Sequence, residues 1–75
     1  MDPERLRDVV ARNIRRHAAR RKLTLPMLAD HAGVAQGALY RVVNEQAYIR
    51  IDTLARVADA LGVPPKALVD DKGVE

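Results

Sequence analysis

The chain has 75 residues, no cysteine and a formal net charge of +3. A chain of this length forms one domain with a small core, and without cysteine neither a disulfide nor a thiolate metal site can support that core. No apolar stretch is long enough to span a membrane and no apolar signal segment follows the charged N-terminus, so we expect a cytoplasmic protein.

The first helix is predicted to begin at Pro3 with Asp2 as its N-cap. An apolar stripe at helical spacing follows, widened by Val9 and formed by Leu6, Val10, Ile14 and Ala18. Positive charge is concentrated in residues 1–24, and the last turn of this helix ends with the cationic group Arg20, Arg21 and Lys22. A basic end on a small domain suits phosphate binding, and a solvated helix face is the equal alternative.

A second helix is predicted from Leu25 to His31, with Thr24 as its N-cap and with Leu28 and Ala29 facing inward. Gly33 follows at once and is expected to supply the left-handed conformation that ends many helices. A third helix is predicted from Ala35 to Val43 or Asn44, and its inner face carries Leu39 and Val42. Residues 45–50 then form a loop.

The fourth helix is predicted from Ile51 or Asp52 to Leu61, where Gly62 ends it. The inner face of this helix is expected to consist of Leu54, Ala55, Ala58 and Leu61. Two prolines at 64 and 65 force an extended step, and Pro65 opens a short fifth helix that runs to Val69. We therefore expect one domain over residues 1–75, with a core from about 5 to 69 and a flexible tail over 70–75.

Two short helices separated by a tight turn at Gly33 meet the physical requirements of a helix-turn-helix. A small residue at Ala29 lets the second helix cross close to the first, Val34 fills the corner, and Leu39 fixes the second helix to the core. The second helix of such a unit can enter a DNA major groove, which is about 12 Å wide. The pattern thus predicts binding to double-stranded DNA.

From about Val10 to Val69 the sequence resembles the phage repressor and Cro-type family, also called the XRE-type helix-turn-helix family. The resemblance is carried by Ile14-Arg15-Arg16, Leu23-Thr24, Leu28-Ala29, Ala32-Gly33-Val34, Leu39, residues 53–61 and Gly62-Val63. It implies an all-α, five-helix, lambda-repressor-like domain that binds a palindromic operator, often as a homodimer. We expect a transcriptional regulator that acts by occupying its operator, without a cofactor, and, because so short a chain leaves no room for an effector domain, without a small-molecule effector.

The resemblance assigns the base-facing positions to Gln36, Gly37 and Arg41, with Tyr40 nearby, and a phosphate contact to Asn44. Gln36 can bond adenine through two hydrogen bonds, and Arg41 can read guanine or hold a phosphate. The other candidate phosphate contacts are Arg20, Arg21, Lys22, Thr24, Tyr48 and Arg50. The sequence departs from the usual family residues at several positions, among them Leu25 in place of a glutamine, Pro26 in place of an acidic residue and Ala35 in place of a hydroxyl cap.

A homodimer needs a surface, and the apolar residues of the last helix are the first candidate. That surface would consist of Val63, Ala67, Leu68 and Val69. The alternative is the N-terminal end of the first helix, around Leu6 and Val9.

Other functions remain as alternatives to specific operator binding. The small residues on the third helix also suit a protein-interaction module, such as an antitoxin-like partner or an anti-repressor, and the basic first helix suits non-specific nucleic-acid binding. An enzyme is not expected, because the chain contains neither serine nor cysteine and has no phosphate-binding glycine loop. His17 and His31 lack the partners of a metal site, and His17 is expected to be half-buried.

Overall fold

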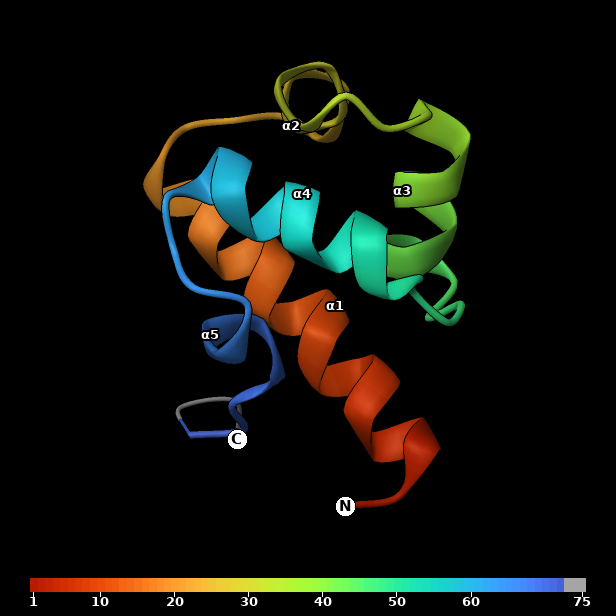
Figure 1. The fold of residues 1–75 in the computed structure, drawn as a ribbon. Coiled ribbons are helices and arrows are strands. Elements are labelled where there is room, and N and C mark those ends of the chain that lie inside the picture. Colours follow the sequence, from red (N-terminus) through yellow and green to blue (C-terminus); the bar gives the residue numbers. More distant parts are fainter. Residues whose placement is uncertain (73–75) are drawn as a thin grey trace.

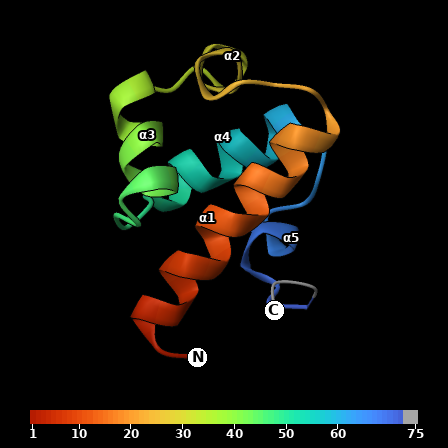
Figure 2. The same cartoon turned by 180° about the vertical axis from the view of Figure 1, so that it is seen from behind.

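The computed structural model describes residues 1–72, and this part of the chain contains helices but no strand. The five helices are α1 (Pro3–Arg20), α2 (Leu25–Ala32), α3 (Gln36–Asn44), α4 (Ile51–Leu61) and α5 (Lys66–Val69). The predicted all-α, five-helix architecture is confirmed. Figures 1 and 2 show α2 and α3 at one end of the molecule, with the N-terminal half of α1 and α5 towards the other. None of the described helices is long and apolar enough to cross a membrane.

The core is made of small aliphatic side chains from all five helices. Val10, Ile14 and Ala18 of α1 are buried as predicted, whereas Leu6 lies at the edge of the core with 37% of its surface exposed. On α4 the predicted inner residue Ala55 is exposed and Val57 is fully buried instead. Residues 54, 57, 58 and 61 fit a helical face better than 54, 55, 58 and 61 do, so the prediction for Ala55 was wrong.

Helices α1, α2 and α4 end in the same way, with a backbone hydrogen bond from an N–H group to the carbonyl five residues before it. The N–H groups of Leu23, Val34 and Val63 donate to the carbonyls of Ala18, Ala29 and Ala58, at 2.9, 3.0 and 3.0 Å. This closure requires a left-handed residue just before the donor. Gly33 and Gly62 supply it with φ of 70° and 71°, and Lys22 supplies it with φ of 57°.

Asn13 is a fully buried polar residue that the sequence prediction missed. Its Nδ2 group donates to the backbone carbonyls of Leu68 and Asp70, each at 2.9 Å. The asparagine therefore fastens the end of α5 to α1, in place of the helical bonds that so short a helix lacks. The tail predicted for 70–75 thus begins with an anchored residue, and residues 73–75 lie outside the described part.

Candidate nucleic-acid interface

The turn between α2 and α3 is built as the sequence predicts. The Thr24 hydroxyl accepts a bond from the Met27 N–H at 3.2 Å and so caps the start of α2. Gly33 ends that helix, and Leu28, Ala29 and Leu39 are fully buried. These three buried side chains hold the inner face of α3 against the core, so the opposite face of α3 is directed to solvent.

The four residues predicted to face DNA bases lie together on that outer face. Gln36, Gly37, Tyr40 and Arg41 are all exposed, and their spacing places them on one side of α3 over two turns. The Arg41 side chain reaches back along the helix, because its Nη1 atom lies 3.5 Å from the point that a Cβ on Gly37 would occupy. The Arg41 guanidinium is therefore carried back to the first turn of α3, the turn on which Gln36 lies.

Two further cations flank the turn and α3. Arg50 is exposed and pairs with Asp52, the Nε to Oδ1 distance being 3.2 Å. Arg56, on the outer face of α4, has its Nη1 atom 3.8 Å from the point that a Cβ on Gly33 would occupy. The sequence analysis did not select Arg56, although its place on the polar face of a helix beside the turn was a usable indication.

Asn44, predicted to hold a phosphate, lies at the last turn of α3 and is half-buried. Its Oδ1 atom accepts a hydrogen bond from the guanidinium of Arg15 on α1. The contact ties the end of α3 to α1 and brings to this position a cation that the sequence analysis left unassigned. A phosphate at this end of α3 would therefore meet an arginine as well as an amide.

The cations at the end of α1 are exposed, but Arg21 is directed away from α3. Its guanidinium lies over Gly62, at the C-terminal end of α4, where the helix dipole favours a positive charge. Figures 1 and 2 show that this end of α4 lies away from α3. The structure thus separates Arg21 from the base-facing group, and Arg20, Arg21 and Lys22 are all exposed.

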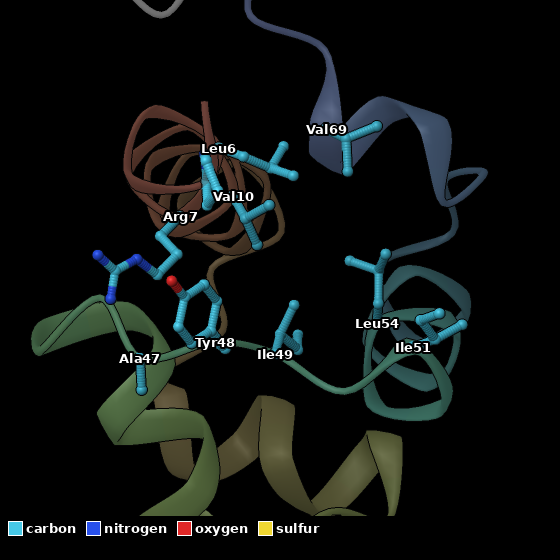
Figure 3. Close-up of a pocket in the computed structure, with 10 residues that line it drawn as sticks. Leu6, Arg7, Val10, Ala47, Tyr48, Ile49, Ile51, Leu54 and Val69 are labelled. Carbon is cyan, nitrogen blue, oxygen red and sulfur yellow. The ribbon is translucent and has the colours of Figure 1, made fainter. Parts of the chain in front are cut away.

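Tyr48, another predicted phosphate contact, lines a hollow with Arg41 and Arg50 and also borders a second surface. Its ring is 68% exposed, and the guanidinium carbon of Arg7 lies 4.4 Å from the ring centroid, a cation–π contact. Figure 3 shows both residues at the rim of an apolar groove that also takes in Leu6, Ile51 and Val69. The groove has a volume of about 200 Å³.

The groove includes residues from both predicted dimer surfaces, whereas other residues of those surfaces are buried or half-buried. Leu6 from the alternative surface and Val69 from the first one face the same groove. Leu68 and Val9 are fully buried, so neither has a side chain to offer to a partner. Val63 and Ala67 are half-buried, and Val63 packs on the core. The most exposed apolar residue at the rim is Ile51, at 86%.

His17 is half-buried, as predicted. Burial lowers the pKa of its imidazole below 6.5, and the nearby charges of Arg16, Arg20 and Arg21 lower it further. No group of histidines and carboxylates within residues 1–72 could hold a metal ion. The cations identified beside α3 are arginines, which can bind anions and polar base edges.

Comparison with known proteins gives a family match over most of the chain. Residues 13–72 match the family model described as the Cro/C1-type HTH DNA-binding domain. Searches of curated proteins and of solved structures gave no match.

Proposed function

The chain belongs to the family of Cro/C1-type HTH DNA-binding domains, and from this premise we propose that it is a transcriptional regulator that occupies a specific operator as a homodimer. One observation carries the proposal: Gln36 and Arg41 are both exposed on α3, with the Arg41 guanidinium beside Gly37, while Leu39 on the inner face is fully buried. A rigid helix that presents an amide and a guanidinium is suited to the major groove, where adenine and guanine offer paired acceptors and donors.

In the proposed complex, α3 lies in the major groove with its first turn against the bases. Gln36 bonds to N6 and N7 of an adenine, and Arg41 bonds to O6 and N7 of a guanine. Arg50 and Arg56 stand beside the turn and the start of α4, where they contact phosphates of the flanking backbone. Arg15 and Asn44 do the same at the end of α3.

We assign the dimer contact to the groove around Leu6, Tyr48 and Ile51. An exposed isoleucine beside an apolar groove is costly in water and stabilising when a second copy covers both. The groove includes the loop after α3, and in the proposed dimer both copies of α3 face one side of a duplex. Half-sites would then lie about 34–36 Å apart.

The test of DNA reading is a selection of bound sites from random duplexes at physiological salt. We expect a palindromic site, and we expect Arg41→Ala to weaken binding to it while leaving the unfolding transition unchanged. Arg12→Ala is the matched control, because Arg12 is an exposed arginine of α1 that pairs only with Asp8 in the described structure. No enrichment over random sequence, or equal losses for both variants, would contradict the assignment of α3.

Salt dependence separates the proposal from a protein-interaction module of the same fold. Binding through phosphates weakens with a log–log slope of about −0.9 for each phosphate neutralised. For the dimer, Ile51→Glu is expected to give monomers by sedimentation, whereas Met27→Glu, an exposed apolar residue outside the groove, should leave the dimer intact. A monomeric unaltered protein at all concentrations tested would remove the dimer.

A further inference from the structure

A second apolar hollow, of about 230 Å³, lies between the first turns of α2 and α3, beside the base-facing residues. Its walls are Leu25, Pro26, Gln36, Gly37 and Tyr40. Leucine and proline bring no side-chain donor or acceptor, and glycine brings no side chain at all. The polar groups that side chains contribute to these walls are therefore the Gln36 amide and the Tyr40 hydroxyl.

This hollow is continuous with the surface that reads DNA, so its occupant must be a feature of the major groove. The edges of the four base pairs are lined there by hydrogen-bonding groups, with one apolar exception, the C5 methyl group of thymine. Resting on the proposed function, we infer that the hollow receives the C5 methyl of a thymine. Leu25 and Tyr40 are then specificity-determining residues that select thymine next to the base read by Gln36.

The geometry of α3 keeps the hollow open. Apart from its chain neighbours and the backbone of its own helix, a Cβ built on Gly37 meets one atom within 4 Å, Arg41 Nη1 at 3.5 Å. Tyr40 is 54% exposed, and its ring forms one side of the hollow. Arg41 does not line the hollow, although its Nη1 atom lies 3.5 Å from the point that a Cβ on Gly37 would occupy.

The experiment changes the DNA and leaves the protein unaltered. Each thymine of a selected operator is replaced in turn by deoxyuridine, which removes only the C5 methyl, and the dissociation constant is measured at fixed salt. We expect one position in each half-site to lose about fourfold in affinity, the factor that corresponds to the burial of one methyl or methylene group. Other thymines should change the affinity by less than twofold.

Variants of the protein test whether the thymine methyl lies in this hollow. Leu25→Gln should reduce the penalty for deoxyuridine at that position to below twofold, and Gly37→Ala, which places a methyl of its own in the hollow, should do the same without touching the core. Met27→Gln is the control, because Met27 is an exposed apolar residue of α2 that does not line the hollow. It should retain the fourfold penalty.

The outcomes distinguish this inference from the function on which it rests. Specific binding with no position sensitive to deoxyuridine would overturn the methyl site and leave the operator-binding function standing. A penalty that persists in both Leu25→Gln and Gly37→Ala would also overturn it, because the methyl would then lie elsewhere. Absence of any selected site would remove the proposed function and, with it, the methyl site.

Discussion

Replacement of Asn13 by leucine tests whether a hydrogen-bonded polar residue stabilises this small core more than an apolar residue of similar size. In the structure its Nδ2 donates to the carbonyls of Leu68 and Asp70, and its Oδ1 accepts from the Arg16 guanidinium at 2.9 Å. Asn13→Leu removes the side-chain donor to both carbonyls, at a cost of about 1–3 kcal/mol for the buried Leu68 carbonyl and less for the partly buried bond to Asp70. The added apolar surface offsets part of this loss.

We expect the free energy of unfolding to fall by about 2–4 kcal/mol. For a domain of this size 1 kcal/mol corresponds to roughly 4–8 °C, so the melting temperature should fall by roughly 10–30 °C. Urea unfolding followed by circular dichroism measures the change, and hydrogen exchange should show faster opening at Leu68 and Val69 than elsewhere. Asn44→Leu is the control, since Asn44 is half-buried and its side-chain bond is to Arg15 near the surface. Equal or greater stability of Asn13→Leu would refute the reasoning.

Three further predictions follow from the helix ends and the surface. Lys22→Gly should raise the free energy of unfolding by about 1 kcal/mol in urea titrations, because Lys22 is left-handed where α2 and α4 use glycine. Gly37→Ala should raise it by a similar amount through helix propensity, since a Cβ fits there. The lowered pKa of His17 means that the unfolded chain binds the proton more tightly, so the melting temperature should fall as the pH drops through about 6.5, and His17→Gln should reduce that fall.

The positions of the helices could be predicted because local residues decide them. Asp2 and Thr24 supply caps, and Gly33 and Gly62 supply left-handed ends, each through contacts within a few residues. The base-facing group on α3 could be placed for the same reason, since helical spacing aligns Gln36 with Tyr40 and Gly37 with Arg41.

Contacts between distant segments account for what the sequence did not predict. The packing of α4 and α5 on α1 determines three of these features. Leu68 is buried, Asn13 is hydrogen-bonded to the end of α5, and the side chain of Arg21 lies over Gly62. The apolar residues of the last helix were interpreted as an exposed surface. No local feature of the sequence shows that Asn13, 55 residues before Leu68, is hydrogen-bonded to the backbone of this helix. Arg7 meets Tyr48 across a similar separation.

The same packing connects the proposed dimer contact to the reading helix, and so to the spacing between the two half-sites of the operator. At its first turn α3 is held by the helix-turn-helix, and at its last turn Asn44 is bonded to Arg15 of α1. The other end of α1 carries Leu6, which lines the groove proposed as the dimer contact. Because α1 is one continuous helix of 18 residues, it joins the groove to the reading helix without a flexible segment between them. A loosened Arg15–Asn44 contact should therefore relax the preferred half-site spacing before it weakens binding to a single half-site.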